Sequence, residues 1–257
     1  IYLIYMRWKI AMNSIAIIGG TGLTSFAGLE IVRKEVVRTP YGTPSAPLTY
    51  GQYCGKQIIF LPRHGSRHNI PPHMINYRAN LWALHDKGVQ DIIAVAAVGG
   101  IDAAINPTKV VIPEQIIDYT YGRQQTFFEK DLVSVKHVDF SQPYDARLRQ
   151  HLLTAGHEAS LELFAGGVYG VTQGPRLETA AEIDRLERDG CQVVGMTGMP
   201  EAALARELGI NYAHCAVAVN WAAGRGEQAI TLESIQQCTQ QGMIKVRSLL
   251  AALMATL

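Results

Sequence analysis

The sequence predicts an α/β fold in which a central, largely buried sheet is flanked by helices. Short apolar runs, typical of buried strands, alternate along the chain with longer segments whose apolar residues recur at helical spacing. Charged residues make up 18% of the 257 residues, below the roughly 25% usual for soluble domains. That low share, together with 24 glycines, is typical of much buried α/β structure.

The expected strands are apolar runs bounded by glycines or polar residues. The runs 48–53 and 58–61 flank Gly55 and Lys56, which favours a hairpin between them. Helical segments separate most of the other runs, as expected for a sheet with covered faces. The predicted strands comprise residues 15–18, 58–61, 92–98, 109–112, 168–172, 193–194 and 212–219.

The clearest helix lies near the end of the chain. Apolar residues there stand at i, i+3, i+4 and i+7, beginning at Val246 and ending at Leu253. Tyr77, Leu81 and Leu84 repeat the same spacing. Further helices are expected over residues 144–158, 179–189 and 200–208, and Pro200 suits a first helical turn.

One domain is expected, over residues 12–257, with residues 1–11 a leader or extension outside the fold, because no repeat or linker divides the chain. The four cysteines lack CxxC or metal-ligand spacing, which favours reduced thiols in a cytoplasmic protein. The net charge of +1 gives no electrostatic case for a nucleic-acid or membrane partner.

Three loops that follow strands could bind an anion, because ligands collect at the carboxyl ends of strands. The glycine-rich turn 19–22 offers backbone N–H groups and the Thr21 hydroxyl. Arg63 supplies a planar fork suited to phosphate, and His64 adds a second donor. Thr197 lies near a helix start, where amides attract anions. A tight turn, a solvated strand end and a simple helix cap are the structural alternatives.

Two further residues could contact an organic ligand. Glu178 precedes a helix, and it accepts a ligand N–H if its side chain points into the cleft. Asn220 ends an apolar strand and offers one acceptor and two donors. A first-turn acid and a turn-forming Asn are the alternatives. No catalytic elbow, HExxH helix, P-loop or dinucleotide fingerprint is present, and the histidine spacing favours no metal site.

Six separated segments of the sequence form a recognisable set when they are taken together. In chain order they are GGTGL (19–23), RHG (63–65), NYRANLWAL (76–84), AVGGI (97–101), GPRLET (174–179) and GMTGMPEAALARELGI (195–210). From about residue 15 to the C-terminus, the chain with these segments resembles the trimeric purine nucleoside phosphorylase and methylthioadenosine phosphorylase family. The resemblance implies one α/β domain around a mixed sheet, a pentosyltransferase of purine salvage, and inorganic phosphate as co-substrate. It implies neither a metal nor an organic cofactor.

The resemblance also implies roles for particular residues. Ala96 departs from the family, which usually has Ser, Thr or Asn there, so one phosphate contact is missing. Met196 matches the residue that packs against the sugar. His137 resembles the segment that closes the neighbouring subunit's site, which implies a homotrimer. The positions that match phosphate-binding residues are Thr21, Arg63, His64, the backbone at Ala97, and Thr197.

The base site indicates a 6-oxopurine. Glu178 matches the glutamate of members specific for such bases, and Asn220 and Ala222 stand where adenine-specific members carry aspartates. A carboxylate only accepts hydrogen bonds, so it suits N1–H of hypoxanthine and would face a lone pair on adenine. Asn220 can donate to O6 or N7 of the departing base. The catalytic candidates are therefore His64, Glu178 and Asn220, and Leu177 and Trp221 are flanking substrate-binding candidates.

The sugar site indicates a methylthio group. Leu232 stands where inosine-specific members commonly place a His, and with Ile235 it predicts an apolar 5′ pocket. The predicted reaction is phosphorolysis of S-methyl-5′-thioinosine to hypoxanthine and 5-methylthioribose 1-phosphate. Cleavage of 5′-methylthioadenosine, cleavage of inosine or guanosine, and a non-catalytic purine-binding role remain as alternatives.

Overall fold

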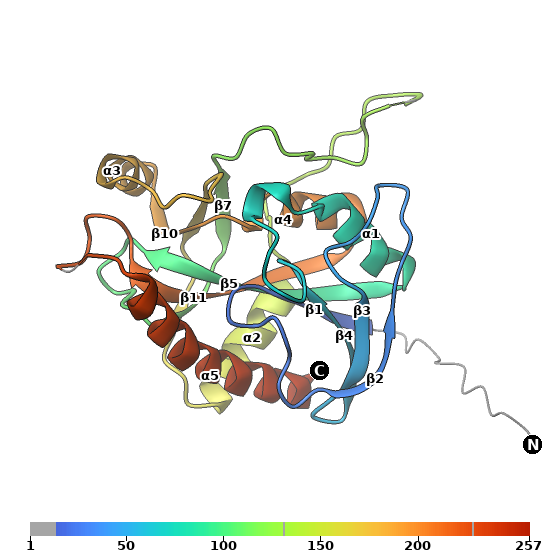
Figure 1. Ribbon diagram of the computed structural model, residues 1–257, viewed down its shortest axis with the longest axis horizontal. Helices are drawn as coiled ribbons and strands as arrows, with labels where there is room; N and C mark the ends of the chain where they lie inside the picture. The colour runs from blue at the N-terminus through green and yellow to red at the C-terminus, as the bar shows by residue number, and fades with distance from the viewer. Residues whose placement is uncertain (1–13, 131, 228) are drawn as a thin grey trace, which may run out of the picture.

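A mixed sheet of eleven strands forms the centre of the molecule, with helices packed on it (Figure 1). The structure is a computed structural model that describes residues 14–257 except 131 and 228, so the predicted leader, 1–11, lies outside the described residues. The predicted α/β class is confirmed. No helix in the described part of the chain is long and apolar enough to cross a membrane.

The strands run in the order β2-β3-β4-β1-β5-β10-β9-β7, and β11 pairs with both β5 and β6, while β8 pairs with β6. β5 is the central strand, because β1 and β11 flank it in parallel and β10 joins its end in antiparallel. The strands are β1 (Ser14–Gly19), β2 (Glu30–Glu35), β3 (Leu48–Tyr53), β4 (Lys56–Pro62), β5 (Val89–Gly100), β6 (Val110–Ile112), β7 (Gln115–Asp118), β8 (Leu163–Ala165), β9 (Val168–Val171), β10 (Cys191–Gly195) and β11 (Asn211–Trp221).

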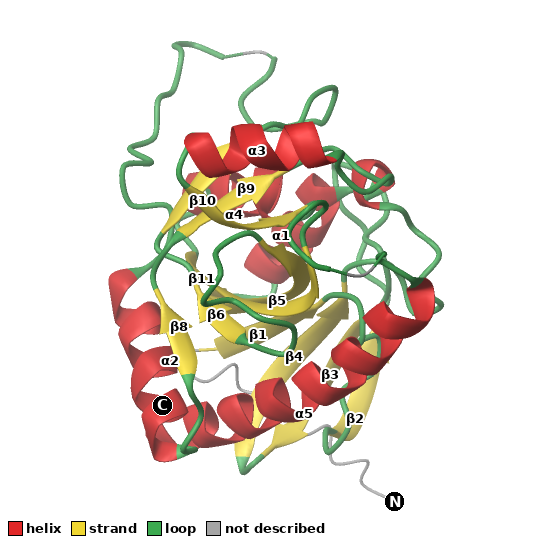
Figure 2. Cartoon of the chain, turned by 90° about the vertical axis from the view of Figure 1, so that its left-hand side faces the viewer, coloured by secondary structure: helices red, strands yellow, loops and turns green. Residues whose placement is uncertain are grey.

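The helices cover the sheet from two sides. α1 and α4 share one buried apolar cluster, which contains Leu81 and Leu204. α2 and α5 share a second cluster, which contains Leu152 and Leu250. Figure 2 shows α3 and α5 at opposite ends of the molecule. The helices are α1 (Tyr77–Asp86), α2 (Ala146–Glu158), α3 (Ala180–Arg188), α4 (Gly198–Glu207) and α5 (Leu232–Thr256), with a 3-10 turn, η1, over Pro72–Met74.

Every predicted strand and helix overlaps an element of the structure, and the expected hairpin is the antiparallel pair β3–β4. Three strands were not predicted, and each has a physical reason. β2 lies at the edge of the sheet and is exposed along most of its length, so its sequence EIVRKE has no apolar run. β7 and β8 are as short as the predicted strands β9 and β6, but neither contains a fully buried residue, so no buried apolar run marks them.

Candidate active site

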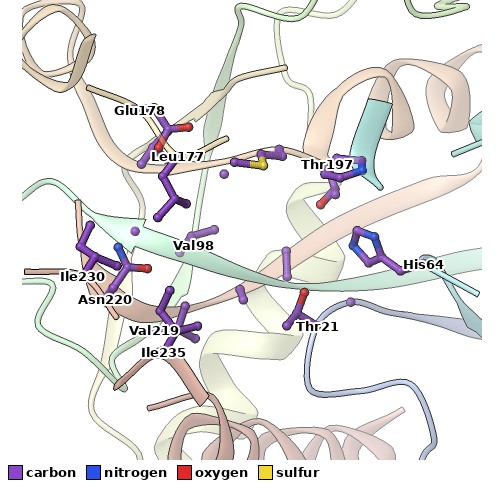
Figure 3. A pocket seen from close by; sticks show the side chains of 18 of the residues that line it. Thr21, His64, Val98, Leu177, Glu178, Thr197, Val219, Asn220, Ile230 and Ile235 are labelled. Carbon is purple, nitrogen blue, oxygen red and sulfur yellow. The ribbon is translucent and has the colours of Figure 1, made fainter. Parts of the chain in front are cut away.

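A cavity of about 170 Å³ opens at the carboxyl ends of β1, β4, β10 and β11 and beside the carboxyl-terminal part of β5 (Figure 3). Each strand delivers the loop that follows it, which explains why residues far apart in the sequence meet here. The described lining consists of Gly20, Thr21, Arg63, His64, Pro72, Ala96, Ala97, Val98, Gly99, Leu177, Glu178, Val194, Gly195, Met196, Thr197, Val219, Asn220, Ala223, Ile230 and Ile235.

The glycine-rich turn lies directly against the buried floor of this cavity. A Cβ atom at Gly20 would stand 2.6 Å from the carbonyl oxygen of Val95 and 3.0 Å from Nη1 of Arg63. Only glycine allows so close an approach to backbone. The turn is therefore fixed beside Arg63, and Thr21 faces the same cavity.

Arg63 is fully buried and its charge is matched by a buried carboxylate. Its Nε donates to Oε2 of Glu201 at 2.6 Å, and Nη2 donates to Oε1 at 2.7 Å. Nη1 donates to the carbonyl of Val95 at 2.8 Å. Burial lowers the pKa of Arg63, but the Glu201 carboxylate raises it by more, so the guanidinium stays charged. The remaining N–H groups of Nη1 and Nη2 are those that a ligand could use.

Sequence reasoning overlooked Glu201. Its side chain is fully buried, and it also accepts a hydrogen bond from the hydroxyl of Tyr212 at 2.8 Å. The available sign was an acid in the apolar start of α4, in the sequence GMPEAALA, where a solvated charge is unexpected.

His64 is a neutral imidazole at pH 7. Burial, aided by the charge of Arg63, lowers the pKa of His64 to about 4. Its Nδ1 lies 2.9 Å from the carbonyl oxygen of Ile70, which can only accept, so Nδ1 carries the proton. Nε2 is then the acceptor nitrogen of the neutral ring, whereas the sequence predicts that His64 donates to an anion. Close to His64, Oγ1 of Thr21 lies 3.1 Å from Nε2 of His68.

Thr197 precedes α4, but its side chain makes no capping hydrogen bond. The residue is nearly buried and lines the cavity. A capping role therefore does not occupy the hydroxyl, which contacts Tyr169 and lies beside the amides of the helix start.

A carboxylate and an amide line the other end of the cavity, as Figure 3 shows for Glu178 and Asn220. Oε1 of Glu178 accepts a hydrogen bond from Oγ1 of Thr172 at 2.6 Å. Nδ2 of Asn220 donates to the carbonyl of Trp221 at 2.6 Å. Glu178 keeps its second oxygen for a ligand, and Asn220 keeps its carbonyl oxygen and one N–H. Leu177 lies beside Glu178 in the same wall.

The apolar part of the wall differs from the prediction in one residue. Ile235 lines the cavity as expected, together with Val219 and Ile230. Leu232 does not, because it is the first residue of α5 and is 81% exposed. The neighbouring Thr231 caps the helix, which places Ile230 inside and Leu232 outside.

Ten predicted site residues meet in this cavity and four do not. Ala222 is buried behind it, and Trp221 lines an adjacent depression. His137 is exposed and remote from the lining, as is Leu232. The ten are Thr21, Arg63, His64, Ala97, Leu177, Glu178, Met196, Thr197, Asn220 and Ile235. No metal-binding group of three or more His, Cys, Asp or Glu occurs among the described residues.

An α/β domain whose cavity joins clustered anion donors to a carboxylate and an amide has the architecture of a nucleoside phosphorylase. The model of the phosphorylase superfamily matches residues 14–255, and the chain belongs to this superfamily. It is 52% identical over 244 residues to a probable S-methyl-5′-thioinosine phosphorylase of Pseudomonas syringae pv. tomato, covering 95% of this chain and 99% of the relative.

The chain is also similar to a second relative and to a solved structure. The chain is 44% identical over 235 residues to a 6-oxopurine nucleoside phosphorylase of Pyrococcus furiosus, covering 90% of this chain and 88% of the relative. Its fold matches that of a methylthioadenosine phosphorylase from Schistosoma mansoni in complex with adenine, with a TM-score of 0.90 and 31% identity, covering 95% of this chain and 91% of the other. The predicted family is confirmed.

Proposed function

We propose that the protein cleaves the N-glycosidic bond of 6-oxopurine nucleosides with phosphate, and that S-methyl-5′-thioinosine is its preferred substrate. The observation that carries the proposal is the free oxygen of Glu178 in the cavity wall, because it matches a base that donates from N1. The relatives named as S-methyl-5′-thioinosine and 6-oxopurine nucleoside phosphorylases support the same class.

The proposed reaction transfers the pentosyl group from the base to phosphate. Thr21, Arg63 and Thr197 hold the anion at one end of the cavity, with the backbone at Ala97. An oxygen of hydrogen phosphate attacks C1′ as the bond to the purine breaks. The purine leaves with the electron pair of that bond and takes up the proton that hydrogen phosphate gives up, which yields hypoxanthine. The negative charge of the phosphate stabilises the cation-like sugar. Glu178 and Asn220 hydrogen-bond the departing base, and Met196 packs against the sugar. Inorganic phosphate is the co-substrate, and no cofactor is required.

Three alternatives have weaker support. Adenine would leave the Glu178 carboxylate facing a lone pair, which disfavours 5′-methylthioadenosine. A 5′-hydroxyl would meet the apolar side chains of Ile230 and Ile235, which disfavours inosine. A non-catalytic purine-binding protein is favoured only by Ala96, which lines the cavity without a polar group.

Replacing Ile235 by Ser should narrow the preference for S-methyl-5′-thioinosine over inosine. An apolar wall separates a thioether from a hydroxyl by about 1–3 kcal/mol, so the ratio of kcat/KM should fall about tenfold. The measurement is phosphate-dependent release of hypoxanthine from both nucleosides. Leu232→Ala is the matched control, because this exposed side chain lies one turn away and its loss should leave the ratio unchanged. An unchanged ratio in Ile235→Ser would contradict the proposed 5′ pocket.

The proposal extends to a cytoplasmic homotrimer that serves purine salvage. The segment 132–139, between β7 and α2, projects from the body of the molecule in Figure 1 and exposes Val133, Val135 and Val138. A neighbouring subunit would cover these side chains and bring His137 to its own sugar pocket. The molecular mass of the native protein in solution tests this trimer, and a fully active monomer would refute it.

The proposed compartment is the cytoplasm. All four cysteines are free, which supports a reducing compartment.

A further inference from the structure

Arg123 joins two loops of the cavity although it does not line the cavity itself. It lies in the segment after β7, and its guanidinium donates to backbone carbonyls on both loops. Nη1 donates to Met196 at 2.8 Å and to Met199 at 2.6 Å. Nη2 donates to Gln173 at 2.8 Å and to Thr172 at 3.3 Å. Four carbonyls therefore converge on one side chain, two from the loop after β9 and two from the loop after β10 and the start of α4.

Each loop carries one half of the proposed chemistry. The loop after β9 begins at Thr172 and leads to Glu178, which faces the base. The loop after β10 contains Met196 and Thr197, which face the sugar and the phosphate. Closer to the sheet, the loops are joined by the backbone bond from Thr172 N to the carbonyl of Gly195 at 2.8 Å. Arg123 adds a second connection further out.

The backbone of α4 is shaped for this contact. Met199 has non-helical torsion angles, φ −116° and ψ 140°, inside the first turn of the helix. A carbonyl in that conformation leaves the helical hydrogen-bond pattern, and here it accepts from Arg123.

The partners of Arg123 among the described residues are neutral. Besides the carbonyls, its Nε donates to the side-chain oxygen of Gln173 at 3.1 Å, and Nη1 lies 3.3 Å from the hydroxyl of Tyr77. An ion pair would need one carboxylate, whereas these contacts need a planar group that donates in several directions. A lysine ammonium has three donors on one atom and cannot span the same set.

We propose that Arg123 is a positioning residue that sets the separation between the base end and the phosphate end of the cavity. This inference rests on the proposed function, because the reacting atoms are those of the nucleoside and the phosphate. Holding both loops at one spacing aligns the phosphate oxygen with C1′. A misplacement of about 1 Å in such an alignment costs on the order of 100-fold in rate.

The experiment compares Arg123→Ala, Arg123→Lys and the unmodified protein. In Arg123→Ala, kcat/KM for S-methyl-5′-thioinosine should fall about 100-fold, with the KM of both nucleoside and phosphate raised. Guanidinium ion added to the buffer at low concentration should raise the kcat/KM of Arg123→Ala at least tenfold, and this increase should saturate as the guanidinium concentration rises. Arg123→Lys should remain impaired, because charge alone does not replace the fork. Thermal unfolding of each variant shows whether it is folded under assay conditions.

Arg149→Ala is the matched control. Its Nε also donates to a backbone carbonyl, that of Pro113 at 2.8 Å, and it is half-buried but lies outside the cavity. Its kcat/KM should stay within twofold of the unmodified protein and should not respond to guanidinium. If Arg123→Ala keeps its activity within threefold, or if guanidinium restores nothing to a folded variant, the inference is wrong.

Failure of the inference can be told apart from failure of the proposed function. If the unmodified protein cleaves no purine nucleoside, the proposed function is wrong, and calorimetric binding of inorganic phosphate then tests Arg123 alone. Phosphate should bind at least tenfold more weakly to Arg123→Ala, and equal binding would overturn the inference. If Arg123→Ala does not fold, the inference is tested by comparing kcat/KM and phosphate binding of Arg123→Lys with those of the unmodified protein.

Discussion

Replacing Arg63 by Met is expected to lower the free energy of unfolding by about 3–5 kcal/mol and to abolish phosphate-dependent cleavage. Arg63 and Glu201 are both fully buried and share two hydrogen bonds. Removing one partner leaves a buried carboxylate without its counter-charge, which is the origin of so large a cost. Urea unfolding measures the stability, and release of hypoxanthine measures the activity.

The double variant Arg63→Met with Glu201→Gln separates stability from function. The introduced amide would be neutral and could still accept the hydrogen bond of Tyr212, so most of the lost stability should return. Phosphate dependence should not return, because the donor that faces the cavity is still missing. Arg185→Met is the control, since its exposed pair with Asp189 should contribute below about 1 kcal/mol. A double variant with normal phosphate dependence would remove Arg63 from the site.

The second large effect is expected in the choice of base. The unmodified protein should prefer S-methyl-5′-thioinosine to 5′-methylthioadenosine by on the order of 10⁴-fold in kcat/KM, because sites built on hydrogen bonds discriminate strongly. Glu178→Ser combined with Asn220→Asp should move activity toward the adenine nucleoside, since the serine can donate to N1 and the aspartate can accept from the exocyclic amine.

A second carboxylate close by in the chain provides the control for base choice. Glu182 lies four residues from Glu178, where it completes the capping box of α3 and pairs with Arg176. Glu182→Gln should leave the ratio between the two nucleosides unchanged. Efficient cleavage of 5′-methylthioadenosine by the unmodified protein would contradict the argument from Glu178.

Much of the fold could be predicted because buried strands consist of consecutive apolar residues in the sequence. The proposed phosphate end of the cavity could be predicted for a related reason. Thr21, Arg63 and Thr197 each follow such a run, and the ends of neighbouring strands meet. β2 escaped prediction because this edge strand is exposed along most of its length and carries charged residues in place of an apolar run.

What could not be predicted depends on the direction of side chains. Spacing places Leu232 and Ile235 near one helix start, but the capping residue Thr231 decides which side chain faces the cavity. The pairing of Arg63 with Glu201 joins residues 138 positions apart, and no local pattern contains it. Whether the hydroxyl of Thr197 caps α4 likewise depends on the geometry of that helix, because capping and ligand binding call for the same residue type.

The protonation of His64 bears on which oxyanions the cavity accepts. With the charge of Arg63 balanced by Glu201 and the imidazole neutral, the proposed binding of an anion depends mainly on hydrogen-bond geometry. Hydrogen phosphate carries a proton that it can donate to Nε2 of His64. Sulfate has the same shape and charge but no proton at neutral pH, so the ring nitrogen would meet an oxygen lone pair. For the proposed phosphate site we therefore expect the buried imidazole to favour hydrogen phosphate over sulfate, two ions that a purely cationic pocket would bind alike.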